Sequence, residues 1–318
     1  FKSIAYIAIA CALPIAASSC KSDNNGQSAV NGSDSTAVSS SASTGADAAT
    51  ATASASNFQQ LEYKDATTGK TLKYNLYTPA NIDKDKTYPL VLFIGDASTA
   101  GKEVTLPASK EGAQVWTTDQ WQSEHPCYVL VPQFTAVAVN DEYKTTDEAD
   151  LVMRLLNTLN SELNIDTDRI YATGQSMGGM LSMYYDVNYP KMFAAAMIVD
   201  SPCDNATVSS LVKHNFIYIV SGNQGKAYPC IEAIEDAARN EGVSYTAAEW
   251  SAQLPQGQQD DLARTMLDKG APINIFQFEA GSVVPEGVEV TPANEHMYSF
   301  DYAYRNSAAR EWLFNQHK

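Results

Sequence analysis

Short apolar runs recur along the chain from residue 72 to residue 278, with turn-forming residues between them. Most of them are apolar at nearly every position, which is typical of strands buried on both faces of a parallel sheet covered by helices. We predict eight strands: Leu72–Tyr77, Pro89–Ile94, Tyr128–Val131, Ile170–Thr173, Ala194–Val199, Phe216–Val220, Tyr245–Trp250 and Ile273–Phe278.

Helical patterns lie between these runs. The clearest covers Asp147–Leu163, where leucines recur at spacings of three and four. Thr145 stands three residues before Glu148 near its start, a spacing that predicts a capping box. The other predicted helices are Ser176–Tyr189, Ile231–Asn240, Gln258–Lys269 and Tyr302–Phe314. This alternation predicts an α/β fold, a doubly wound, mostly parallel sheet of about eight strands flanked by helices, in one domain over residues 58–318.

The first 57 residues differ in composition from the rest. Residues 1–20 combine Lys2, an apolar stretch too short to span a bilayer and a run of small residues before Cys20, which is typical of a lipoprotein-type signal peptide. An ordinary signal peptide with an incidental cysteine is the alternative. Residues 21–57 are rich in Ser, Ala and Thr, so we expect a disordered tether. The expected location is extracytoplasmic, periplasmic or at the cell surface, with membrane contact only through a lipid anchor on Cys20.

The charge balance narrows the choice of partners. The chain has 21 Lys and Arg against 37 Asp and Glu, for a formal net charge of −16. Binding to a phosphate backbone depends on Lys and Arg, so the composition argues against a nucleic-acid partner.

Three cysteines lie in the predicted domain. Cys127 sits in an apolar run and is expected to be a buried thiol. Cys203 and Cys230 each follow a proline in a predicted loop. A disulfide between Cys203 and Cys230 would suit an oxidising compartment, and two free thiols are equally open from the sequence.

The strongest chemical signal is the G-x-S-x-G motif of Gly174–Gly178, which follows a predicted strand and opens a predicted helix. In a nucleophile elbow the serine occupies a strained strand-to-helix turn that needs glycine on either side. Ser176 is therefore the candidate nucleophile, and the Met177 N–H a candidate oxyanion donor. A glycine-rich turn without chemistry is the alternative.

At these residues the chain resembles a known family. The segments IYATGQSMGGM from Ile170 and NYPKMFAAA from Asn188 resemble the elbow region of the α/β-hydrolases in the polyhydroxybutyrate-depolymerase and feruloyl-esterase-like esterase family, which also includes peptidases. The resemblance extends from about Tyr88 to Phe314 and includes Asn294–Met297. It implies the α/β-hydrolase fold and hydrolysis by a serine nucleophile, but no particular substrate.

The general base is chosen among four histidines. His317 is the penultimate residue, and His214 and His125 precede strands, at the edge of the sheet where strands begin. His296 alone follows the last predicted strand, in an expected loop before the C-terminal helix. An α/β-hydrolase delivers its histidine at that place in chain order, so His296 is the candidate base.

The acid does not follow the family pattern. The resemblance implies an Asp near Gln224, yet residues 221–229 contain no carboxylate. Asp200 or Asp204, after the preceding strand, is the first alternative, and a bond between Cys203 and Cys230 would join the two loops. A Ser–His dyad and a degenerate hydrolase that only binds are the others. Either Asp could instead cap the helix that follows it.

The second oxyanion donor is expected in the turn after Ile94, from the backbone N–H of Asp96 or Ala97. The Asp96 carboxylate would have to point away from the oxyanion. Aromatic residues in predicted loops are candidates to line the pocket: Trp116, Trp121, Tyr143, Tyr228 and Tyr298.

The residues predict hydrolysis without a cofactor, because no metal-ligand spacing and no dinucleotide or phosphate loop is found in the sequence. We expect a serine hydrolase of small-molecule or glycan-linked carboxylic esters. A serine peptidase of the same fold and a non-catalytic surface lipoprotein that binds a ligand in the cleft are the alternatives.

Overall fold

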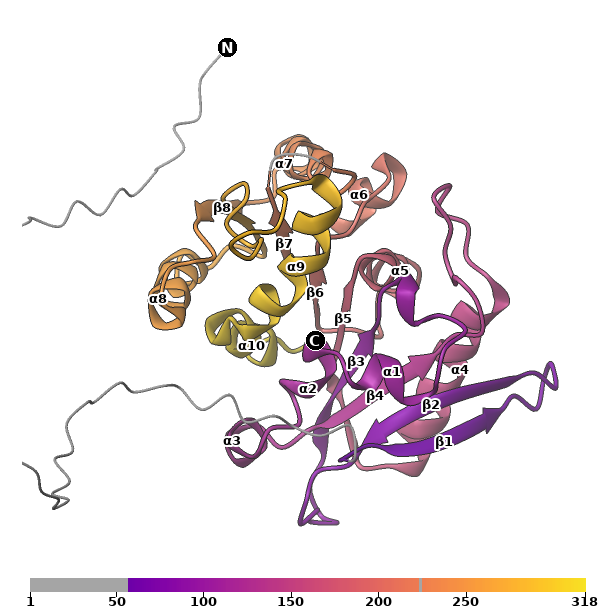
Figure 1. Ribbon diagram of the computed structural model, residues 1–318. Coiled ribbons are helices and arrows are strands. Elements are labelled where there is room, and N and C mark those ends of the chain that lie inside the picture. Colours follow the sequence, from indigo (N-terminus) through magenta and orange to yellow (C-terminus); the bar gives the residue numbers. More distant parts are fainter. Residues whose placement is uncertain (1–56, 223–224) are drawn as a thin grey trace, which may run out of the picture. The chain divides into compact units, whose positions relative to one another are not determined.

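The computed structural model describes residues 57–222 and 225–318, which contain a sheet in the order β1-β2-β4-β3-β5-β6-β7-β9-β8 (Figure 1). The doubly wound α/β sheet predicted from the sequence is present. Its strands are β1 (Gln59–Lys64), β2 (Thr71–Tyr77), β3 (Tyr88–Ile94), β4 (Tyr128–Gln133), β5 (Ile165–Gln175), β6 (Ala195–Val199), β7 (Phe216–Ser221), β8 (Tyr245–Trp250) and β9 (Ile273–Phe278).

The sheet is mostly parallel. β2 runs antiparallel to both of its neighbours, β1 and β4, whereas every pairing from β4 to β8 is parallel. The carboxyl ends of β3, β5, β6 and β7 therefore meet at one edge of the sheet, which is where α/β proteins of this kind bind their ligands.

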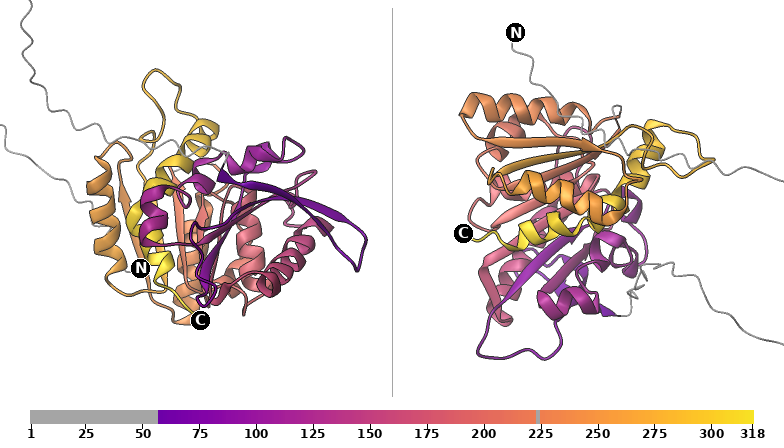
Figure 2. Two further views of the ribbon diagram at one scale, coloured as in Figure 1. Left: turned by 90° about the horizontal axis from the view of Figure 1, so that it is seen from below. Right: turned by 90° about the vertical axis from the view of Figure 1, so that its left-hand side faces the viewer.

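Helices cover both faces (Figure 2). α4 (Asp147–Glu162), α5 (Met177–Asn188), α6 (Asn205–Leu211) and α7 (Pro229–Glu241) pack on one face. The helices on the other face are α1 (Thr105–Ala108), α2 (Glu111–Gln114), α3 (Asp119–Glu124), α8 (Gln256–Leu267), α9 (Pro292–Arg305) and α10 (Ser307–Phe314). Alternate residues of β3 serve the two layers, Leu90 and Leu92 one and Val91 and Phe93 the other. This explains why the strand is apolar throughout.

The prediction of about eight strands missed β1. Five of its six residues are exposed, and it pairs only with β2 at the edge of the sheet. It therefore lacks the apolar run by which the other strands were recognised.

Two helix predictions were wrong. The capping box is absent, because Thr146 precedes α4 without a side-chain cap and the Glu148 carboxylate instead accepts hydrogen bonds from Thr135. The single helix expected at Tyr302–Phe314 is two, since Asn306 has extended backbone angles and its side chain caps α10 through the Ala309 N–H at 2.9 Å.

The signal peptide and the tether, but for Asn57, were predicted for residues outside those that the structure describes. Within the described ranges, none of the helices is long and apolar enough to cross a membrane.

Candidate active site

Ser176 lies on the sharp turn between β5 and α5. Its backbone angles, φ 53° and ψ −117°, are rare for a residue with a side chain. A Cβ on Gly174 would come within 2.3 Å of the Gly178 backbone, and one on Gly178 within 2.0 Å of the Ile94 carbonyl oxygen. Both motif glycines are thus required by close backbone packing, and the turn has the geometry of a nucleophile elbow.

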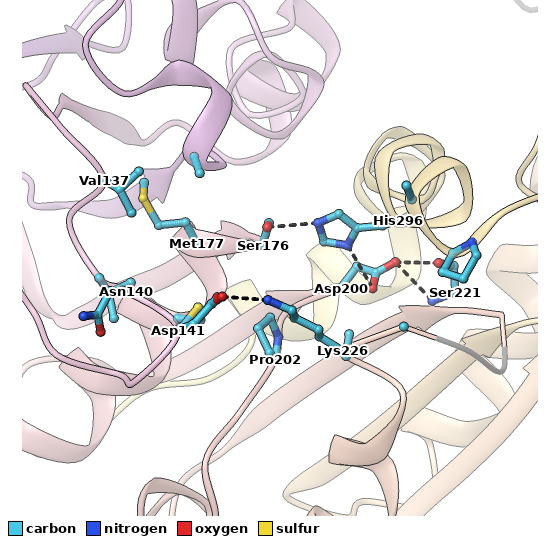
Figure 3. A pocket seen from close by; sticks show the side chains of 17 residues that line it. Val137, Asn140, Asp141, Ser176, Met177, Asp200, Pro202, Ser221, Lys226 and His296 are labelled. Atoms are coloured by element: carbon cyan, nitrogen blue, oxygen red, sulfur yellow. Dashed lines mark hydrogen bonds and ion pairs between the residues drawn. The ribbon is translucent and has the colours of Figure 1, made fainter.

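His296 faces this serine. Its Nε2 lies 2.9 Å from Ser176 Oγ, within hydrogen-bond distance (Figure 3). The ring packs edge-on against Phe300, with centroids 5.0 Å apart. His296 was expected in a loop before the C-terminal helix, but it lies in the second turn of α9, whose start at Pro292 the sequence prediction missed.

Asp200 stands on the other side of the imidazole, at the end of β6. Its Oδ1 lies 3.4 Å from His296 Nδ1. The other oxygen, Oδ2, accepts hydrogen bonds from Ser221 Oγ at 2.5 Å, Ser299 Oγ at 2.6 Å and Ser221 N at 3.3 Å. The residue is 3% exposed and has a φ of 41°. The imidazole of His296 therefore lies between the Ser176 hydroxyl and the Asp200 carboxylate.

Asp204, the other candidate acid, lies elsewhere. Its carboxylate caps α6 by accepting hydrogen bonds from the N–H groups of Ala206 at 2.9 Å and Thr207 at 3.0 Å. The helix-capping interpretation thus describes Asp204 and not Asp200. Close by, Cys203 is joined by a disulfide to Cys230 of α7, whereas Cys127 is free and buried.

Ser221 and Ser299 were not singled out from the sequence. Ser299 lies three residues after His296, so the two share a face of α9 and a helical reading from Pro292 would have placed them together. Ser221 ends β7, the strand after which the family resemblance implies the acid.

Two of the three expected oxyanion donors lie at the pocket. Ala97 and Met177, the first residue of α5, both line the pocket that contains Ser176. The Asp96 carboxylate is held by the Ser98 N–H and by Gln175 Nε2, each at 2.9 Å. Burial raises the pKa of this carboxyl, but the hydrogen bonds from Ser98 and Gln175 outweigh it, so the pKa lies below its usual value.

The pocket around Ser176 has a volume of about 560 Å³. Asp141 and Lys226 at its wall form an ion pair with a 2.7 Å separation, and both are well exposed (Figure 3). The aromatic lining predicted from the sequence is wrong. Trp116 and Trp121 are buried in the core, and the other three aromatics, Tyr143, Tyr228 and Tyr298, also lie outside the lining.

No group of three His, Cys, Asp or Glu side chains within residues 57–222 and 225–318 could hold a metal ion. The arrangement suits acid–base chemistry at a serine: a hydroxyl in contact with an imidazole, which is in turn in contact with a carboxylate. The chain order Ser176, Asp200, His296 is that of α/β-hydrolases.

The strand order, the nucleophile elbow and the contacts of His296 with Ser176 and Asp200 show that the protein is an α/β-hydrolase. Residues 66–264, more than half of the chain, match the family model Esterase, whose description is "Putative esterase". The chain belongs to this esterase family. No curated protein matches its sequence.

Solved structures share the fold. A thermostable esterase superposes with a TM-score of 0.63 and is 24% identical, over 83% of this chain and 64% of that one. The chain thus spans just under two thirds of the length of that esterase. A mutant of the feruloyl esterase module from Clostridium thermocellum, complexed with sinapinate, gives a TM-score of 0.53 at 14% identity over 81% of this chain and 88% of that one.

Proposed function

We propose that the protein hydrolyses carboxylic esters, with Ser176 as the nucleophile, His296 as the general base and Asp200 as the acid of the triad. The observation that carries the proposal is the pair of contacts made by His296, Nε2 to Ser176 Oγ at 2.9 Å and Nδ1 to Asp200 Oδ1 at 3.4 Å. Membership of the esterase family supports it.

The reaction begins when Ser176 Oγ attacks the carbonyl carbon and His296 Nε2 takes its proton. The N–H groups of Met177 and of Asp96 or Ala97 bind the oxygen that becomes negative in the tetrahedral intermediate. The carbon–oxygen bond to the alcohol then breaks, and the imidazolium returns its proton to the departing oxygen. Water attacks the acyl-enzyme by the same steps and releases the acid and Ser176.

Asp200 has two roles in this scheme. It keeps the proton of the neutral imidazole on Nδ1, so that Nε2 can accept one, and its negative charge stabilises the imidazolium. The 3.4 Å separation between Asp200 Oδ1 and His296 Nδ1 supports a full triad over a Ser–His dyad.

The proposal is tested by steady-state hydrolysis of p-nitrophenyl butanoate. We expect Ser176→Ala to lower kcat by at least about 10⁴-fold, because it removes the nucleophile. Ser209→Ala, an exposed position on α6, is the matched control and should keep wild-type turnover. Turnover that survives in Ser176→Ala would refute the role of this serine.

A panel of short peptides and feruloylated sugars, assayed alongside, separates the alternatives. Faster cleavage of peptides than of esters would make the protein a peptidase. A folded protein that cleaves neither class would be a binding protein. We expect ester turnover to dominate, with a small-molecule or glycan-linked ester as the substrate.

We further propose that the protein works outside the cytoplasm on a lipid anchor at Cys20. The sequence of residues 1–20 and a disulfide, which suits an oxidising compartment, support this location. Cell fractionation tests it: Cys20→Ala should move the protein from the membrane to the soluble fraction, and a variant that stays with the membrane would contradict the anchor.

A further inference from the structure

A second, smaller cavity lies next to the pocket of the candidate nucleophile. The pocket of about 560 Å³ contains Ser176 and His296, and a second cavity of about 20 Å³ lies between α5 and the loop of the Cys203 disulfide. Three residues line both cavities: Val139, Met180 and Pro202. These three side chains therefore form a shared wall.

The chemistry of ester cleavage orients a substrate in the larger pocket. His296 must protonate the departing oxygen, so the alcohol lies on the His296 side of Ser176. The acyl group then extends to the opposite side. Val137 and Met177 occupy that side (Figure 3).

Met180 continues the same surface. It lies three residues after Met177 on α5, so both side chains project from one face of the helix. Met180 is 7% exposed, and its neighbours at the shared wall, Val139 and Pro202, are also apolar. An acyl chain that runs away from His296 along this face reaches Met180.

The apolar part of the pocket lining is aliphatic. Among the described residues that line the pocket, the apolar ones are Ala97, Val137, Val139, Met177, Met180, Pro202, Ala227, Pro292 and Ala293, and none is aromatic. Asn140 and the Asp141–Lys226 ion pair add polar groups at the wall. Alkyl chains gain about 0.8 kcal/mol for each methylene buried on such a surface. An acetyl group would leave most of it uncovered.

From these observations we propose that the pocket binds an unbranched aliphatic acyl group, and that Met180 is the end wall that sets its length. The proposal rests on the proposed ester hydrolysis and names the substrate class of that same site. Methionine is flexible, and its removal would join the pocket to the cavity beyond it.

The test measures kcat/KM for p-nitrophenyl acetate, butanoate, octanoate and ferulate. We expect wild type to favour butanoate over acetate by at least about tenfold, and over ferulate. Met180→Ala should raise the octanoate-to-butanoate ratio by about tenfold or more, and Met180→Phe should lower it by a similar factor. The ratio is independent of the fraction of enzyme that folds. Met153→Ala, at a buried position on α4, is the matched control and should keep the wild-type ratio.

The possible results distinguish a failure of the acyl assignment from a failure of the proposed ester hydrolysis. A ratio that Met180→Ala leaves unchanged, or a preference for ferulate, overturns the acyl assignment while ester hydrolysis stands. Alkyl acetates that differ only in the alcohol form a second series, and sensitivity to Met180 there instead would place the alcohol in this pocket and overturn the proposal. If no ester is cleaved and Ser176 takes no fluorophosphonate, the proposed function itself fails.

Discussion

The two oxygens of Asp200 have different surroundings. Oδ2 accepts hydrogen bonds from the hydroxyls of Ser221 and Ser299, whereas Oδ1 faces His296. The two serines fix the rotation of the carboxylate about its Cβ–Cγ bond, and this fixes which oxygen the imidazole meets. Asp200 follows β6, whereas the family resemblance implies an acid after β7.

Ser299 is therefore a positioning residue. Ser299→Ala should lower kcat by about tenfold or more, since a hydrogen bond to a charged group is worth about 1.5–3 kcal/mol. KM should stay near wild type because the side chain is buried behind Asp200. Steady-state kinetics on p-nitrophenyl butanoate gives both values. An unchanged kcat in a folded variant would show that Ser221 alone suffices.

Substitution at the two aspartates distinguishes their roles. Asp200→Asn should lower kcat by about 10⁴-fold, because the amide cannot stabilise the imidazolium. Asp204→Ala should keep wild-type kcat but lower the free energy of unfolding by about 1 kcal/mol, since it removes the cap of α6. Turnover assays and urea denaturation measure the two effects. The reverse pattern would assign the acid to Asp204.

At the residue scale, the sequence predicted those catalytic residues whose role depends on local structure or on position along the chain. Gly174 and Gly178 marked the turn that Ser176 occupies, and position after the last strand selected His296 among the histidines. The sequence left Asp200 and Asp204 unresolved because they are four residues apart in one loop. The choice depends on a backbone φ of 41° at Asp200 and on the path of α9, both of which are set by tertiary packing.

At the scale of the elements, α5 carries one buried carboxylate, Asp186, which the mechanism does not use. Asp186 is 1% exposed, and its Oδ1 lies 3.6 Å from Nδ1 of His214. Burial raises the pKa of Asp186 to about 8, so the folded protein holds a proton that the unfolded chain, with a pKa of about 3.9, releases. The stability that this proton provides is present below about pH 4 and is lost as the pH rises through about 8.

Between about pH 7 and pH 9, the free energy of unfolding should fall by about 1–2 kcal/mol in wild type and remain flatter in Asp186→Asn. Burial lowers the pKa of His214, so its contribution grows with pH and is complete near its unfolded value of about 6.5. Urea denaturation at each pH provides the measurement, with exposed Asp268→Asn as the control. Parallel curves for wild type and Asp186→Asn would contradict the protonated state.

Elements were predictable where they are buried. β3 and the first five residues of β7 form continuous apolar runs because helices cover both faces of the sheet. β1 shows no such run because it is an exposed edge strand. The boundary between α9 and α10 was missed because it depends on the extended backbone at Asn306, within a stretch whose helical pattern continues on both sides.

At the scale of the molecule, the strand order assembles the site. β3, β5, β6 and β7 are consecutive in the sheet, and the Asp96 turn, Ser176, Asp200 and Ser221 follow their carboxyl ends or complete them. The alternation of strands and helices was enough to predict this shared edge. It did not reveal that α9 begins at Pro292 and carries His296 and Ser299 on one face.

The central claim is that Ser176 is an activated nucleophile, and covalent labelling tests it most directly. After the folded protein reacts with a fluorophosphonate, peptide mapping by mass spectrometry should find one modified serine, Ser176, and Ser176→Ala should take no label. An unlabelled wild-type protein, or a label on another serine, would contradict the account.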